Sequence, residues 1–445
     1  MDHARLLRIA VVGLILSIPI WWLLGLDQGV WLVIGFVLGG YALVSHRVDR
    51  RIALLGILFL TSALLAGFLS AHGLRWLTFA RDVLLAIAFF GTILGTVAAC
   101  RERRALQEIL LALAAFLTLS AIASIAAVLL QRPFAFSTPI APLVPDVIAS
   151  TQLGAASLTE RALAVPSYFL GAYFWRPQGF FLFATSEAVA QAVAVPVLLI
   201  AARWRVPYWR LLTVAAGLNL VSLVATTTRG PLLALAAAVL IVWFARRWVI
   251  GSIRIEIPLG MRTIPALVAG VGLVLAALQL SGATDALVRF ATTRSGETRS
   301  ALYEATFERW QQRPLLGWGT EVDLIPTPTP RPTPTPRPTP TPEPLTPEQM
   351  PPLGSHSLYL GVLFKQGLVG MVILVALIGL VLMRLRRWFS PPQAAGDLLW
   401  VAILTSLGAG LTEELWLDPA TAVVVAVAWG LALSPTFRVI GEQPG

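Results

Sequence analysis

An arginine and a histidine in the second half of the chain stand where chemistry on an anionic substrate could take place. Arg229 links two apolar runs that have almost no loop between them. An arginine at membrane depth is costly, so Arg229 either snorkels to the lipid interface or forms an anion site facing a cavity. His356 immediately precedes another apolar run. A lone histidine is usually structural, but this position beside an arginine-bearing segment favours a catalytic proton acceptor.

The segment 299–310 predicts an amphipathic helix that begins with an arginine. Its aromatic residues fall four and then three positions apart, on one helical stripe expected to pack downward: Tyr303, Phe307 and Trp310. Arg299 lies four residues before this stripe, at its edge. The helix should end at Arg313, which precedes a proline, and residues 315–319 predict a turn bracketed by glycines.

The elements that hold these residues must be membrane helices. The chain has 445 residues, of which 57% are apolar and only 13% are charged, against about 25% in an average soluble domain. A soluble core cannot bury that much apolar surface, so a cytosolic globular enzyme and a largely disordered chain are both excluded. The single cysteine, Cys100, excludes a disulfide scaffold. The composition therefore predicts an all-α, polytopic membrane protein with about twelve helices of ~20 residues.

Apolar runs and basic clusters alternate along the chain, which predicts its topology. We expect spans near residues 7–25, 29–45, 52–70, 83–100, 108–131, 181–203, 211–228, 231–245, 263–281, 358–384, 398–414 and 418–435. The basic clusters are residues 46–51, 101–104, 246–247 and 384–387. All of them lie on the cytoplasmic side if both termini are cytoplasmic, as the positive-inside rule requires. The first run is long and lacks a clear cleavage site, so we interpret it as an uncleaved helix.

This topology divides the chain into five parts. They are N-terminal membrane helices 1–131, a first extracytoplasmic loop 132–180, central membrane helices 181–281, a large extracytoplasmic loop 282–357, and C-terminal membrane helices with a short cytoplasmic tail, 358–445. The large loop is expected to carry short helices. Its Thr-Pro repeats, residues 326–352, block helix and sheet, so we interpret them as an extended spacer. A partner-binding ligand or a glycosylated stalk is the alternative.

Several motifs in order give the chain a family resemblance. They are Thr-Arg-Gly at 228–230, Arg-x-x-x-Tyr at 299–303, Arg-Pro-Leu-Leu-Gly-Trp-Gly at 313–319, Ser-His-Ser-x-Tyr-Leu at 355–360 and Gly-Leu-Val-Gly at 367–370. In this order they resemble the O-antigen ligase and O-antigen polymerase superfamily of bacterial envelope glycosyltransferases. Arg176, followed by proline and then a glycine, is similar to an upstream feature of that family. The first five spans match only as generic membrane helices.

The resemblance implies transfer of a glycan from a polyprenyl-diphosphate donor to an acceptor hydroxyl, on the outer face of the bacterial plasma (inner) membrane. Arg229 and Arg299 are then the first candidates for binding the diphosphate, and Arg176 is the third, because guanidinium groups bind phosphate oxygens bidentately. Arg299 and His356 are the expected catalytic residues, with His356 as general base. Supporting roles are expected for Arg313, Tyr359, Glu413 and Glu414. The two glutamates would orient the histidine or an arginine, or else anchor the chain at the interface.

The acceptor stays open at this point. Another lipid-linked glycan would make the protein a polymerase, a glycolipid would make it a ligase, and a protein hydroxyl would make it a protein O-oligosaccharyltransferase. The chain departs from the family pattern in ways that concern the acceptor: Ser357 replaces a usual asparagine, Lys365 replaces a frequent acidic residue, and Ser186-Glu187 replace a proline–asparagine pair.

Other classes of protein explain fewer of these features. A transporter or flippase of lipid-linked glycans would also need arginines in a cavity, but it should carry acidic or paired charges deep in several spans. Few such charges are present apart from Glu187 and Lys365. A membrane glycosyltransferase of another group, such as the cell-wall glycan polymerases, is a further alternative. We expect no cofactor, no nucleic-acid partner and no metal ion, since the outer loops lack clustered ligands with metal-site spacing.

Overall fold

A computed structural model gives the fold of the chain. It describes residues 3–45, 48–70, 75–146, 158–169, 172–203, 208–249, 294–319, 357–386 and 394–434. His356, the Thr-Pro tract 326–352 and the span expected near 263–281 lie outside the described residues. The side chain of Arg299 also lies outside them, although its backbone belongs to a described helix.

The described residues form the membrane helices that the apolar runs predict. Seven helices are long and apolar enough to cross a membrane: α1 (His3–Leu24), α2 (Asp27–Val44), α3 (Arg50–Ser70), α4 (Arg75–Ala99), α5 (Arg103–Leu129), α8 (Ala184–Arg203) and α14 (Leu358–Arg386). Four more are apolar but shorter over their apolar part: α9 (Trp209–Ala225), α10 (Arg229–Val249), α15 (Ala394–Ala409) and α16 (Pro419–Leu433). A helix satisfies its own backbone hydrogen bonds, so apolar runs adopt this form in lipid. The chain is therefore a polytopic membrane protein of the all-α class, as expected.

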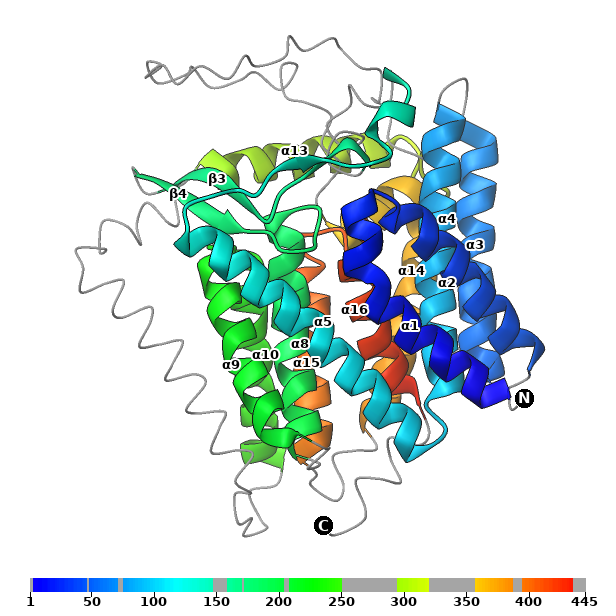
Figure 1. The fold of residues 1–445 in the computed structure, drawn as a ribbon. Coiled ribbons are helices and arrows are strands. Elements are labelled where there is room, and N and C mark those ends of the chain that lie inside the picture. The colour runs from blue at the N-terminus through cyan, green and yellow to red at the C-terminus, as the bar shows by residue number, and fades with distance from the viewer. Residues whose placement is uncertain are drawn as a thin grey trace.

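Helix α16 is the centre of the bundle. Every one of its residues is buried, and it packs against α4, α8, α14 and α15 (Figure 1). Small residues bring other helices close together. A Cβ atom on Gly39 of α2 would lie 2.8 Å from the Cα of Gly91 of α4, so the two backbones touch at this crossing. Close backbone contact through small residues is how helices associate without a hydrophobic driving force between them.

The end of the bundle opposite the start of α1 carries a layer of non-spanning elements. Helix α13 (Arg294–Gln311) lies across this end, beside the strands β3 (Ala164–Phe169) and β4 (Ala172–Pro177) (Figure 1). The two strands pair antiparallel, with Val165 opposite Arg176. A second pair joins β1 (Phe136–Ser137) to β2 (Glu160–Arg161), and a single 3-10 turn, η1, covers Ala141–Leu143. The sequence predicted no strands here, because its aromatic residues favour the lipid interface and strands alike.

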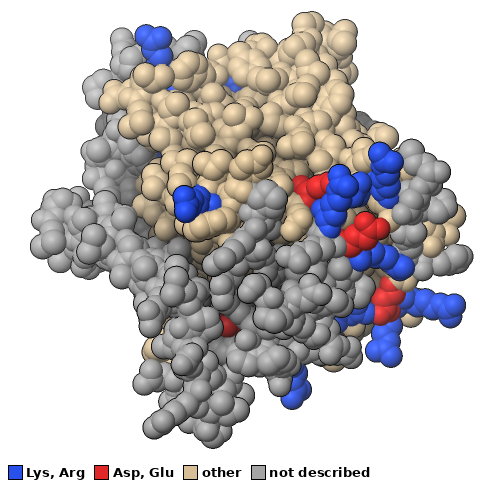
Figure 2. Space-filling view, turned by 60° about the horizontal axis from the view of Figure 1, so that its bottom comes forward, with Lys and Arg blue, Asp and Glu red and all other residues tan. Residues whose placement is uncertain are grey.

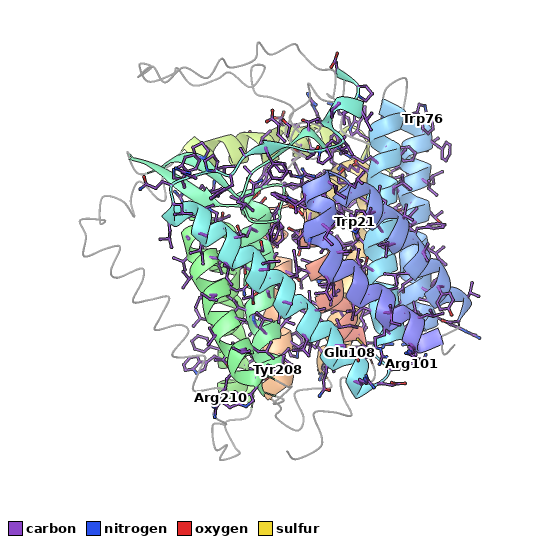
Figure 3. All side chains as sticks on the ribbon, viewed as in Figure 1. Trp21, Trp76, Arg101, Glu108, Tyr208 and Arg210 are labelled. Carbon is purple, nitrogen blue, oxygen red and sulfur yellow. The ribbon has the colours of Figure 1, made fainter. Side chains whose placement is uncertain are left out.

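Charged side chains gather at the other end of the bundle. Figure 2 shows arginines interspersed with acidic residues on this face, and Figure 3 labels Arg101, Glu108 and Arg210 there. Arg8 of α1 lies 3.1 Å from Glu108 of α5, and Arg384 of α14 pairs with Asp49, which precedes α3. Asp49, Arg101 and Arg384, which belong to three of the predicted cytoplasmic clusters, thus lie at this end of the molecule, and α13 lies at the opposite end. The tan part of the surface in Figure 2 carries few charged side chains by comparison.

Candidate active site

A short irregular segment, residues 410–418, is the point at which the candidate elements meet. It connects α15 to α16, and Asp418 closes it by accepting hydrogen bonds from the backbone amides of Ala420 (2.8 Å) and Thr421 (3.3 Å). This carboxylate cap, followed by a proline at the first helical position, is a strong helix start. The segment is therefore fixed at its far end by the N-terminus of the central helix.

Three site-bearing elements contact consecutive residues of the 410–418 segment. The backbone amide of Leu358, at the start of α14, donates to the Gly410 carbonyl at 2.8 Å. The hydroxyl of Tyr303 on α13 donates to the Leu411 carbonyl at 2.9 Å. Gly230, at the start of α10, lies so close to Thr412 that a Cβ atom would overlap the threonine hydroxyl. The starts of α10 and α14 and the middle of α13 are thus brought to one place.

The three main candidates take their positions from these contacts. Arg229 is half-buried and is the first residue of α10, directly before Gly230. Arg299 lies on α13 one helical turn before Tyr303. His356 is outside the described residues, but the next residue is Ser357, whose hydroxyl donates to the Gly410 carbonyl at 3.3 Å.

Arg176 joins Arg229 at the start of α10. Its Nε donates to the Thr226 carbonyl and its Nη2 to the Thr228 hydroxyl, both at 2.8 Å. Thr227 between them has a φ of 53°, so the chain turns sharply here before the helix begins. Strand β4 therefore places the Arg176 guanidinium against Thr228, the residue immediately before Arg229. Two arginines thus lie at the start of α10.

The glycine-bracketed turn after α13 docks into a break in α14. Helix α14 is interrupted at Gly367, where φ is 64° and ψ is −160°, and the break frees backbone groups on both sides. The amides of Trp318 and Gly319 donate to the carbonyls of Phe364 and Lys365, both at 2.8 Å. In return, the amides of Leu368 and Val369 donate to the carbonyls of Pro314 and Leu315, at 2.8 and 3.2 Å. We call these four bonds the 314–319 junction.

Glycine is required on both sides of this junction. Gly317 has a φ of 69°, and a Cβ atom there would overlap the Phe364 carbonyl oxygen. A Cβ atom on Gly367 would likewise overlap the Leu315 carbonyl oxygen. Two motifs that are distant in sequence therefore form one structural unit, which ties α13, and with it Arg299, to α14.

Two expected supporting residues make structural contacts. The guanidinium of Arg313 stacks on the Trp318 ring at 4.3 Å, and the Trp318 indole donates to the Arg309 carbonyl at 2.9 Å. The hydroxyl of Tyr359 donates to the Leu407 carbonyl of α15 at 2.8 Å. The expected packing of the aromatic stripe on α13 holds only in part: Phe307 is 44% exposed, because Tyr303 makes the contact with the 410–418 segment.

The two glutamates lie on the 410–418 segment itself. Glu413 is buried, and Glu414 lies 3.7 Å from the amino group of Lys365 on α14. Lys365 is in turn 3.0 Å from Asp82 of α4. Sequence reasoning passed over Asp82, although a carboxylate inside an apolar run is a signal that could have marked it.

A buried ion pair that the sequence did not reveal holds the segment between α5 and α8. Arg161 of β2 lies 2.5 Å from Asp27 of α2, and both side chains are almost fully buried. Arg161 also donates to the Trp22 carbonyl at 3.0 Å. Asp418 is close enough to interact electrostatically with this pair, and burial raises its pKa to about 7. The loop that carries Arg176 is thus anchored to α1, α2 and the start of α16.

A polar cluster lies beneath Arg176, inside the bundle. The Glu187 carboxylate accepts hydrogen bonds from the hydroxyls of Ser124 and Ser222, both at 2.9 Å, and from the Gln191 amide at 3.2 Å. The Ser222 backbone carbonyl accepts the amide of Thr226 at the end of α9. Glu187 therefore joins the side chains of Ser124 and Ser222 inside the bundle, one helical turn from Thr226.

The arrangement offers cations and helix-start amides to an anion, and it places the residue after His356 nearby. Among the described residues there is no group of three or more His, Cys, Asp or Glu side chains that could hold a metal ion. Phosphate binding at arginines and helix N-termini needs no metal.

Comparison with protein families finds one match. Residues 214–375 match the O-antigen ligase family. The match includes Arg229, Arg299, the 314–319 junction and His356, whereas Arg176 and the 410–418 segment lie outside it. A search of curated proteins finds no match to this chain.

Proposed function

Since residues 214–375 form a domain of the O-antigen ligase family, which implies transfer of lipid-linked glycans, we propose that the chain moves a glycan from a polyprenyl-diphosphate donor to an acceptor hydroxyl. The proposed place of reaction is the outer face of the bacterial plasma membrane, where α13 and the 410–418 segment would lie. The convergence of α10, α13 and α14 on that segment is the observation that carries the proposal.

The start of α10 is the proposed diphosphate site. Arg229 and Arg176 bring two guanidinium groups to a helix N-terminus, where backbone amides and the helix dipole also favour an anion. Arg299, on the helix that Tyr303 ties to the same segment, is proposed to bind the same diphosphate. A diphosphate at headgroup depth would leave the polyprenyl tail in the bilayer.

His356 is proposed to act as the general base. It takes the proton of the acceptor hydroxyl, and the acceptor oxygen forms a bond to the anomeric carbon of the donor sugar. The bond from that carbon to the phosphate oxygen breaks, and the polyprenyl diphosphate leaves with its electron pair. Diphosphate is a good leaving group, so the arginines need only neutralise its developing charge. Loss of one such donor costs roughly 10²–10³ in rate.

The test is to reconstitute the purified protein in lipid vesicles with a polyprenyl-diphosphate oligosaccharide. Three acceptors are offered in turn: a second lipid-linked glycan, a glycolipid and a protein. A glycosylated acceptor, formed with release of polyprenyl diphosphate, supports the proposal and identifies the subclass. Movement of the intact donor across the vesicle membrane without any new glycosidic bond would show a flippase and contradict the proposal.

A further inference from the structure

Four charged side chains form a chain that runs from α4 through α14 to the 410–418 segment. Arg81 and Asp82 of α4 are 2.9 Å apart, Asp82 is 3.0 Å from Lys365 of α14, and Lys365 is 3.7 Å from Glu414. The side chains of Asp82, Lys365 and Glu414 are 13, 12 and 9% exposed. We call this set the charge chain. It links the N-terminal helices to the elements that carry the candidate site.

Stability alone does not account for the charge chain. Removing charges from water costs several kcal/mol per ion, and replacing a buried ion pair by apolar residues of similar size is often neutral or stabilising. Lys365 belongs to α14, whose residues here lie among apolar neighbours such as Val362 and Phe364. A buried charge network is best attested where it fixes one specific arrangement of elements.

Lys365 contacts three separate parts of the structure: the 314–319 junction, α4 and the 410–418 segment. Its backbone carbonyl accepts the Gly319 amide, which is part of the 314–319 junction and holds the end of α13. Its amino group contacts Asp82 of α4 and Glu414 of the 410–418 segment. Asp82, Lys365 and Glu414 line a small cavity, together with Gly319 and Trp416. The 410–418 segment therefore has space beside it into which it could shift.

We propose that Asp82 and Lys365 are positioning residues for glycan transfer: the charge chain holds Glu414, and so the 410–418 segment, in the register at which Leu411 and Thr412 meet α13 and α10. The expected effect on the transfer rate rests on the proposed function. The role of the charge chain in holding the 410–418 segment does not. Asp82 lies in α4, outside the residues that match the O-antigen ligase family, so the N-terminal helices contribute to the site.

The test replaces both charges together, so that neither Asp82 nor Lys365 is left buried without the other. The double variant Asp82→Asn with Lys365→Gln is compared with the matched control Asp49→Asn with Arg384→Gln, which removes an ion pair at the opposite end of α14. Hydrogen–deuterium exchange of the amides of residues 410–417 reports how firmly the segment is held in place. Steady-state transfer kinetics report its consequence.

We expect amide exchange in residues 410–417 to become about tenfold faster in the first variant and to stay unchanged in the control. We expect kcat to fall about tenfold or more, with the KM for the donor within about twofold, because misplacing a reacting group by about 1 Å can cost roughly 10² in rate.

Unchanged exchange in residues 410–417 would overturn the proposal whatever the activity. An equal loss of kcat in the control pair would overturn it too, since the effect would then be a general one on the bundle. If exchange responds as expected while the wild-type protein transfers no glycan to any acceptor, the proposed function fails and the positioning role of the charge chain stands.

Discussion

Replacing Gly367 by alanine tests whether the 314–319 junction positions the site. Gly367 has a φ of 64° and a ψ of −160°, a combination that is essentially restricted to glycine. The new Cβ atom would overlap the carbonyl oxygen of Leu315, which is a backbone atom and cannot move aside by changing rotamer. The substitution must therefore displace either α14 or the 314–319 segment.

The size of the effect follows from the junction. A non-glycine residue held in this backbone conformation costs about 1–3 kcal/mol. Displacement also weakens the four backbone hydrogen bonds of the junction, each with a net contribution of about 0.5–1.5 kcal/mol. We therefore expect a loss of a few kcal/mol in the stability of the contact between α13 and α14. This is enough to detach the end of α13 in a large fraction of the molecules.

Gly379→Ala is the matched control for this experiment. Gly379 lies in the same helix, and a Cβ atom there would meet no other atom within 4 Å. Alanine is favoured over glycine in a helix by roughly 0.5–1 kcal/mol, so this variant should be neutral or slightly stabilised. Thermal unfolding in detergent and glycan transfer are measured for both variants. Gly367→Ala should lower both quantities and Gly379→Ala neither; equal behaviour of the two variants would refute the role of the junction.

Three further predictions concern other parts of the molecule. Arg161→Ala leaves Asp27 buried without its ion-pair partner and should lower the free energy of unfolding by about 3–5 kcal/mol, more than the joint change Arg161→Met with Asp27→Asn; chemical unfolding in detergent measures both. Because burial raises the pKa of Asp418 to about 7 from 3.8, the folded protein binds this proton more tightly than the unfolded chain. The contribution of Asp418 to the stability of the folded protein is therefore full below about pH 4 and is lost as the pH rises through 7. The thermal transition temperature of the wild type should fall between pH 5 and 8. It should fall less in Asp418→Asn, which keeps the helix cap but cannot lose a proton. Deletion of residues 326–352 should leave transfer largely intact, and a loss of transfer in a folded deletion variant would contradict the spacer interpretation.

The sequence predicted the membrane helices well, because lipid imposes a rule that can be read locally. An apolar run of sufficient length must be a helix, and α1–α5, α8 and α14 follow this rule. The 3.6-residue period likewise predicted a helix at 299–310, but its start was wrong: α13 begins at Arg294, so Arg299 lies five residues inside it. The helix ends at Gln311, close to the predicted end at Arg313. The order of the motifs predicted the O-antigen ligase family, which the match over residues 214–375 confirms.

The contacts that build the site could not be predicted in the same way. Tyr303 and Leu411 are 108 positions apart in the sequence, and neither residue type indicates the other as its partner. The junction between Gly317 and Gly367 depends on a break inside helix α14, whose sequence contains no proline that would mark the break. The ion pairs of Asp82 with Lys365 and of Asp27 with Arg161 join residues that are far apart in the sequence. Pairings of this kind follow from how the helices pack, which one sequence by itself does not determine.

The roles of the candidate residues stay predictions, and one measurement tests them most directly. It is a single-turnover assay of polyprenyl-diphosphate release from the oligosaccharide donor, in vesicles that contain the acceptor, with wild-type protein, His356→Ala and Arg299→Ala at equal amounts in the membrane. We predict release and a glycosylated acceptor with the wild type, and neither product with the two variants. Release at the wild-type rate by either variant would contradict the assignment of base and diphosphate ligand.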